Sequence, residues 1–131
     1  MNRVRSEIEE TASGVIDAIV HVHRSLGPGL LESAYQACLY HELAKRGFQL
    51  QVEQPIPIEY DGIKIDNGFR ADMIVNGHLL IENKAVSSLN EVHQAQVITY
   101  LKLAELKLGL LVNWNVRLIK EGIRRIAHGL R

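Results

Sequence analysis

The hydrophobic period of this chain changes once, near Gly47, and that change most constrains its fold. Before it, apolar residues recur at helical spacing over residues 7–26 and 31–46, with a Gly-Pro-Gly sequence at 27–29 between the two segments. After it, apolar and polar residues alternate, as they do in strands with one covered face. The sequence therefore predicts N-terminal helices over residues 6–46, followed by a sheet.

The sheet is expected over residues 49–86, as an antiparallel meander. It is divided by three Asx-Gly pairs, each of which favours a tight turn: Asp61-Gly62, Asn67-Gly68 and Asn76-Gly77. A further helix is expected at 89–106 and an apolar strand covered on both faces at 108–113. The C-terminal element at 117–128 fits a strand or a helix, with a strand favoured. We predict a single α/β (α+β) domain over residues 1–131, with a small mixed sheet flanked by helices that lie on one side of it.

The chain carries 15 basic and 15 acidic residues, so its formal net charge is zero. A protein that holds long duplex DNA usually has a basic excess, so this balance disfavours tight, non-specific duplex binding. The basic C-terminal segment is most simply a solvated surface; its cations are Arg117, Lys120, Arg124, Arg125 and Arg131. One cysteine, no apolar stretch long enough to span a bilayer and no apolar leader together predict a cytoplasmic protein with no membrane part.

Three acidic residues stand where an acid is unusual. Asp72 interrupts the apolar strand at 69–75, Glu82 interrupts the one at 79–86, and Glu32 lies among the apolar residues that open the second helix. A carboxylate in an apolar strand needs a partner, because burying an unpaired charge is costly. Lys84 projects from the same face as Glu82, since side chains two apart in a strand share a face.

Two interpretations of these residues are open. A single acid–base pair, such as Glu82 with Arg70 or Asp72 with Lys84, is more often a structural ion pair than a site. Three carboxylates and a lysine favour a site instead. Carboxylate oxygens are the ligands that Mg²⁺ and Mn²⁺ prefer, and a lysine can position water or stabilise phosphate charge. No Cys/His spacing indicates zinc.

Short motifs in this order resemble a nuclease superfamily. Residues 29–35, with Gly29, Glu32 and Tyr35, are similar to the motif that names the GxxExxY family. Asp72 followed by Glu82-Asn83-Lys84 resembles the D…(D/E)xK core of the PD-(D/E)XK superfamily. Residues 96–100 resemble the Gln-x-x-x-Tyr motif of its RecB-like exonuclease branch. The resemblance runs from about residue 15 to 130 and implies a restriction-endonuclease-like core.

The resemblance implies a role for each matching residue. Mg²⁺ or Mn²⁺ would be held by three carboxylates, those of Glu32, Asp72 and Glu82, with the Asn83 carbonyl as a further ligand. The catalytic set would be Lys84, Glu82, Asp72, Gln96 and Tyr100, in which Gln96 and Tyr100 orient Lys84 or the scissile phosphate. Substrate contacts are expected from Gln96, Tyr100, Arg70 and His93, the last lying one turn before Gln96. Tyr35, one turn after Glu32, is expected to pack in the core.

The middle residue of the Glu82-x-Lys84 motif is polar, whereas an apolar residue is usual there, and Ala71 replaces the proline. Asn83 should point away from the site, so we expect polar contacts on the opposite face of the sheet.

Strand parity gives a condition for the site. If Asn76-Gly77 formed a plain two-residue turn, Asp72 would face Ile81 and Glu82 would lie on the other face of the sheet. A shared site requires a three-residue loop with Gly77 in the left-handed conformation, a bulge within residues 75–78, or a bulge beside Asp72. Given that condition, the Glu32, Asp72, Glu82 and Lys84 side chains should converge on one solvent-reachable pocket with Gln96 and Tyr100 on its rim.

Three functions fit these observations. The first is a Mg²⁺- or Mn²⁺-dependent nuclease that hydrolyses phosphodiester bonds, with single strands or ends favoured over long duplex because the chain is small and uncharged overall. The second is a non-catalytic module of the same fold that binds a metal or a partner, and the third is a structural homodimer with a relic site. The sequence leaves open DNA or RNA as substrate, a homodimer and a protein partner.

Overall fold

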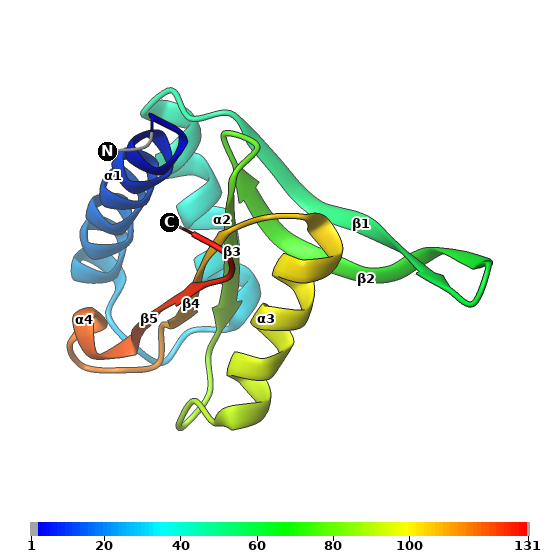
Figure 1. The fold of residues 1–131 in the computed structure, drawn as a ribbon. Coiled ribbons are helices and arrows are strands. Elements are labelled where there is room, and N and C mark those ends of the chain that lie inside the picture. Colours follow the sequence, from blue (N-terminus) through cyan, green and yellow to red (C-terminus); the bar gives the residue numbers. More distant parts are fainter. Residues whose placement is uncertain (1–2, 131) are drawn as a thin grey trace.

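The computed structural model describes residues 3–130, which form four helices and five strands (Figure 1). The predicted domain 1–131 also includes residues 1, 2 and 131, which lie outside the described residues. In chain order the elements are α1 (Arg3–Leu26), α2 (Glu32–Lys45), β1 (Leu50–Tyr60), β2 (Ile63–Val75), β3 (Leu79–Lys84), α3 (Glu91–Ala104), β4 (Leu108–Asn113), α4 (Ile119–Gly122) and β5 (Ile123–Ala127). Over residues 3–130, none of the helices has the length and apolar character needed to cross a membrane.

The five strands form one mixed sheet in the order β1-β2-β3-β4-β5. β3 and β4 pair in parallel, and the other neighbours pair antiparallel. A parallel pair needs a crossover connection, and α3 supplies it. The predicted α+β class with a small mixed sheet is therefore confirmed. Of the two alternatives for the C-terminal element, the favoured strand is present as β5, and the short helix α4 precedes it.

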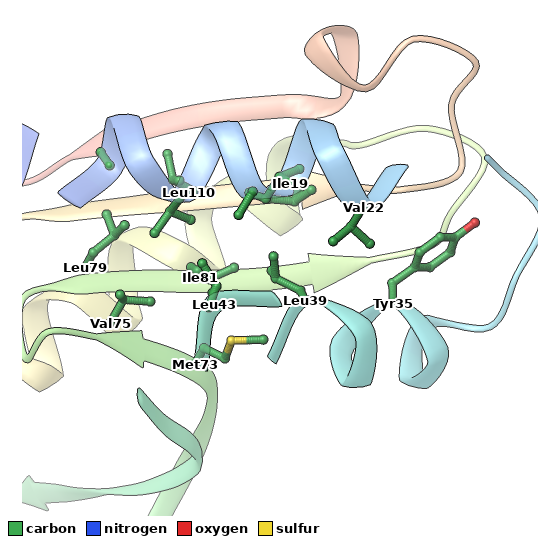
Figure 2. Close-up of a cluster of buried hydrophobic side chains, with 14 of the residues drawn as sticks. Ile19, Val22, Tyr35, Leu39, Leu43, Met73, Val75, Leu79, Ile81 and Leu110 are labelled. Carbon is green, nitrogen blue, oxygen red and sulfur yellow. The ribbon is translucent and has the colours of Figure 1, made fainter. Parts of the chain in front are cut away.

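Helices cover both faces of the sheet, so the prediction that they lie on one side is wrong. On one face α1 and α2 pack against the strands, and Figure 2 shows this core, in which Ile19, Leu39 and Ile81 meet. On the other face α3 packs through Val97 and Leu101. The reason is topological: the helix that connects two parallel strands must pack on the sheet, and here it takes the face that α1 and α2 leave uncovered.

β4 is buried along its whole length, as its apolar sequence predicted. Leu110 belongs to the core under α1 and α2, whereas Leu111 belongs to the core under α3. The strand lies between β3 and β5 and is covered by helices on both faces, which explains why it lacks the polar alternation of β1.

β1 and β2 extend beyond the body of the molecule as a long hairpin arm (Figure 1). The turn predicted at Asn67-Gly68 is wrong, because β2 runs unbroken through these residues. The register between the strands shifts there instead, between Ile56 and Ile58 of β1. Ile58 covers Gly68 so closely that an added Cβ would lie 1.9 Å from its Cγ1. This glycine therefore marks a β-bulge and a close side-chain contact rather than a chain reversal.

Candidate active site

The loop between β2 and β3 decides whether Asp72 and Glu82 can share a site. Val75 pairs with Leu79, so the loop has three residues, 76–78. Asn76 and Gly77 both have positive φ, 51° and 71°, and the His78 amide donates to the Val75 carbonyl at 3.1 Å. The predicted three-residue loop with a left-handed Gly77 is confirmed. The resulting register, continued past the pair Met73–Ile81, brings Asp72 opposite Glu82.

Beyond that pair the two carboxylates replace the regular strand ladder. The Asp72 amide donates to Oε1 of Glu82 at 3.1 Å, and the Asn83 amide donates to Oδ2 of Asp72 at 2.8 Å. Backbone amides thus hold one oxygen of each carboxylate in place. This fixes both side chains next to each other at the point where β2 turns away from β3 into the arm.

Glu82 is buried and Asp72 is half-buried, and burial disfavours the charge of both. Glu82 is 3% exposed, and burial, helped by the neighbouring Asp72 charge, raises its pKa to about 8. Burial also raises the pKa of Asp72, although the Asn83 amide and a hydrogen bond with Glu82 oppose that rise. The two carboxyl groups are therefore close enough to compete for protons, and ionising both leaves a concentrated negative charge.

Lys84 is the cation whose charge affects the pKa of all three predicted acids. Its charge lowers the pKa of Glu32, Asp72 and Glu82 alike, which places its ammonium group near all three. Within residues 3–130, however, no lysine or arginine nitrogen lies within 4.0 Å of these carboxylates. The structural ion pairs considered from the sequence, Glu82 with Arg70 and Asp72 with Lys84, are therefore not formed.

Glu32 and Asp72 line a cleft of about 760 Å³ between α2 and β1. Glu32 is the first residue of α2, and its pKa is raised by burial and by the Asp72 charge. Glu82 and Lys84 adjoin the cleft through Asp72 but are not among its lining residues, so the expected single pocket is only partly formed. Glu53 of β1 also lines this cleft, and its charge raises the pKa of Asp72. Sequence reasoning missed Glu53, which looked like an ordinary exposed residue of an alternating strand.

The three predicted metal-binding carboxylates are not gathered into one ligand set. Within the described residues, no three His, Cys, Asp or Glu side chains lie close enough together to hold a metal ion. Asp72 and Glu82 are adjacent, whereas Glu32 lines the same cleft as Asp72 and is linked to it only by the Asp72 charge, which raises the pKa of Glu32.

α3 brings the predicted Gln96 and Tyr100 together on the face of the sheet that this helix covers. Gln96 Nε2 donates to the Tyr100 hydroxyl at 2.8 Å, and the Tyr100 ring stacks on Phe69 of β2 with centroids 4.0 Å apart. The pKa of Tyr100 is raised by burial and next by the charge of Glu82. Tyr100 therefore lies close enough to the carboxylate pair for the ionisation of that pair to change the pKa of its hydroxyl group.

The other two predicted substrate residues differ in their surroundings. Arg70 is exposed on β2, two residues before Asp72. His93 takes part in the capping box of α3: its amide donates to Asn90 Oδ1 at 3.1 Å, and its Nδ1 accepts from the Asn90 amide at 3.1 Å. These bonds give His93 a structural role at the helix start.

A polar network behind the site holds Asp72 from the opposite face of the sheet. Gln36 of α2 donates to the Asp72 carbonyl at 2.9 Å and accepts from Asn83 Nδ2. Trp114 Nε1 donates to Asn83 Oδ1 at 2.8 Å. Asn83 therefore points away from the site into polar contacts, as predicted. Gln36 and Trp114 were missed, although Gln36 lies one turn after Glu32 on the same helix face and could have been found by that spacing.

Tyr35 is fully buried and packs, as predicted. Its ring stacks on Trp114 with centroids 4.9 Å apart. Its hydroxyl donates to the Gly27 carbonyl at 2.6 Å and accepts from the Leu30 amide at 3.1 Å. Tyr35 thus fixes the loop between α1 and α2, and that loop sets where α2, and with it Glu32, begins.

Comparison with known proteins gives one match. The family model described as the PD-(D/E)XK nuclease superfamily matches residues 9–126. No curated protein and no solved structure matches the chain. The match spans every element from α1 to β5 and includes Glu32, Asp72, Glu82, Lys84, Gln96 and Tyr100. This chain belongs to the PD-(D/E)XK nuclease superfamily.

Proposed function

We propose that the protein is a divalent-metal-dependent nuclease that hydrolyses phosphodiester bonds in nucleic acid. Membership of a nuclease superfamily implies a nucleic-acid substrate. The observation that carries the proposal is the adjacent pair Asp72–Glu82, in which Glu82 is buried and Asp72 is half-buried, with the pKa of Glu82 raised to about 8 and Lys84 near both. Two adjacent acids, one buried and one half-buried, without a paired cation cost stability, and such an arrangement is typical of a functional site.

PD-(D/E)XK nucleases generally use divalent metals, and the donor atoms present fit such an ion. Mg²⁺ is commonly held by one or two carboxylates together with water and substrate phosphate oxygens. Asp72 and Glu82 would hold the ion, and Glu32 would complete its surroundings from the same cleft. We propose Mg²⁺ or Mn²⁺ because the donors are hard oxygens. A bound divalent ion supplies positive charge for phosphate oxygens and lowers the pKa of water.

The remaining residues would act on the substrate directly. Lys84 would hold the attacking water and offset the negative charge that develops on the phosphate oxygens. Tyr100 and Gln96, already joined by a hydrogen bond, would orient Lys84 or the scissile phosphate. Arg70, exposed and two residues from Asp72, would contact the strand next to that phosphate, and His93 would do so from the start of α3.

The finer assignments rest on the sequence. We propose the GxxExxY family and a RecB-like relationship from residues 29–35 and 96–100. We propose a cytoplasmic location from the single cysteine, and single strands or ends as substrates from the small size and zero net charge. A second candidate function, a non-catalytic module that binds a metal or a partner, is favoured by the zero net charge. Homodimerisation and a protein partner are compatible with both functions.

The test is a cleavage assay on purified protein. Labelled single- and double-stranded DNA and RNA are incubated with Mg²⁺, with Mn²⁺ or with a chelator, and Lys84→Ala serves as the inactive control. We expect metal-dependent cleavage of single strands or ends by the wild type and at least about 100-fold less by the variant. Wild-type protein that binds metal but cuts none of these substrates would favour the non-catalytic function. Equal cleavage by Lys84→Ala would reject the proposed site.

A further inference from the structure

A second cleft, of about 390 Å³, lies between the C-terminal half of α1 and the α4 segment, which are side by side (Figure 1). Its floor is apolar, with Val20 from α1 and Ile119 from α4. Three cations line it: Arg24, Arg117 and Lys120. One acid, Glu121, lies among them, so the lining has an excess of positive charge although the chain as a whole has none.

The three cations of this cleft differ from the C-terminal basic residues that lie outside it. Arg125 pairs with Glu9, and Arg124 donates to the Glu121 and Ile123 carbonyls. Arg131 lies outside the described residues. By contrast, no carboxylate within residues 3–130 pairs with Arg24, Arg117 or Lys120, and all three are exposed. Their charge is therefore available to a ligand.

The wall of the cleft is held in place by a buried histidine. His23 is 5% exposed, and its Nε2 lies 3.2 Å from the Trp114 carbonyl and 2.9 Å from the Val116 carbonyl. A hydrogen on Nε2 donates to these acceptors, which ties the loop after β4 to α1. Arg117 follows directly in that loop. The cleft thus exists before any ligand arrives, which reduces the ordering cost of binding.

The same loop connects the cleft to the carboxylate pair. The Trp114 amide donates to the Lys84 carbonyl at 2.9 Å, and the Trp114 indole donates to Asn83. Since β3 and β4 are parallel, their carboxyl ends meet at one edge of the sheet, and both Lys84 and the Trp114–Arg117 loop lie at that edge. A nucleic-acid strand with one phosphate at a metal ion held by Asp72 and Glu82 would continue along this edge toward the cations.

We infer that the cleft between α1 and α4 binds a nucleotide of the substrate strand away from the scissile bond. Its phosphate would interact with Arg24, Arg117 and Lys120, and its sugar and base would lie on the apolar floor and on Leu118, which is 54% exposed. Phosphate contacts of this kind position a nucleic acid without reading its sequence. The inference rests on the proposed function for its choice of ligand, and it explains how a chain without net charge can hold a polyanion.

The experiment measures binding separately from cleavage. A fluorescently labelled single-stranded oligonucleotide is titrated with protein in a chelator, and anisotropy is recorded at several salt concentrations. The variant is Arg117→Gln with Lys120→Gln; both side chains are exposed, and circular dichroism checks that the fold is kept. We expect binding about ten-fold weaker, and a salt slope reduced by about 1.4, which is about 0.7 for each lost phosphate contact on a single strand.

The matched control is Lys102→Gln with Lys107→Gln, which removes the same charge from exposed residues at the other end of the sheet. We expect it to bind like the wild type. Equal binding by all three proteins, equal loss in both variants, or no binding by the wild type at low salt would overturn the inference. If the wild type shows metal-dependent cleavage but the cleft variant binds the oligonucleotide as the wild type does, the cleft is rejected as a binding site and the nuclease proposal stands. Cleft-dependent binding without cleavage would reject the nuclease proposal alone.

Discussion

Asp72 and Glu82 face each other: the Asp72 amide donates to the Glu82 carboxylate, the Asn83 amide donates to the Asp72 carboxylate, and Glu82 is almost fully buried. In most strands such positions hold apolar residues, because the desolvation of a carboxylate is costly. Here that cost appears as the raised pKa of Glu82. At the scale of single residues, the site is therefore a place where the fold is less stable than it would be with neutral side chains.

The first prediction concerns stability against pH in metal-free protein. In the unfolded chain the Glu82 carboxyl titrates near 4.5, and in the folded protein its pKa is about 8. Between these values the folded state keeps a proton that the unfolded state has lost. The free energy of unfolding should therefore fall as pH rises from 4.5 to about 8, by on the order of a few kcal/mol, and the contribution is fully present only below 4.5.

Urea denaturation in a chelator, followed across this pH window, measures the effect. Glu82→Gln keeps the shape of the side chain and cannot ionise, so its free energy of unfolding should fall much less with rising pH. Parallel curves for wild type and variant would show that Glu82 does not titrate in this window.

At the scale of elements, three segments far apart in the sequence meet behind the site. Gln36 of α2, Asn83 of β3 and Trp114 after β4 form a chain of hydrogen bonds, buried at Asn83 and Trp114 and half-buried at Gln36, that ends on the Asp72 carbonyl. Within residues 3–130, no buried side-chain nitrogen or oxygen atom lacks a hydrogen-bond partner. A satisfied network of this kind favours one arrangement of the elements, since any shift leaves a buried polar atom without a partner.

The second prediction tests this network. Trp114→Phe keeps an aromatic ring against Tyr35 but removes the donor to Asn83 Oδ1. The buried oxygen is then unpaired, so we expect a loss of about 1–3 kcal/mol in the free energy of unfolding. Asn83→Ala should also destabilise, and the double variant should lose less than the two single variants together. Additive losses in urea denaturation monitored by circular dichroism would show that the two side chains do not interact.

At the scale of the whole molecule, the carboxylate pair links metal binding to folding. The unfolded chain has no preformed site, because Asp72 and Glu82 come together only through the register of β2 and β3. An ion that binds the folded state alone stabilises it by mass action. The two adjacent carboxylates lower the stability of the metal-free fold, and the binding of a metal ion offsets this loss.

The third prediction is that Mn²⁺ raises the melting temperature. At about a hundred times its Kd, Mn²⁺ should add about 2.7 kcal/mol of stability to the wild type. Asp72→Asn should show little of this gain because it removes one ligand charge. Asp61→Asn, with the same charge change at the exposed tip of the arm, is the matched control and should respond like the wild type. Calorimetry gives the affinities directly, and equal Mn²⁺ binding by Asp72→Asn and wild type would contradict an Asp72 site.

Much of this protein follows from local sequence patterns. Apolar spacing predicted α1, α2, α3 and the fully buried β4, because the covered face of an element is set by the period of its own residues. Parity between two strands joined by a short loop is equally local. It predicted the three-residue loop that brings Asp72 to Glu82.

Tertiary structure decided what depends on contacts between distant segments. The residues of α3 do not by themselves indicate that this helix covers the face opposite α1. Gly68 lies in a bulge rather than a turn because of its contact with Ile58, ten residues away. The placement of Glu53 beside Asp72, the polar network through Trp114 and the cationic cleft between α1 and α4 arise in the same way. The sequence determines the chemistry of each side chain. Which side chains become neighbours is decided only by the packing of the helices on the sheet, because that packing joins segments far apart in the chain.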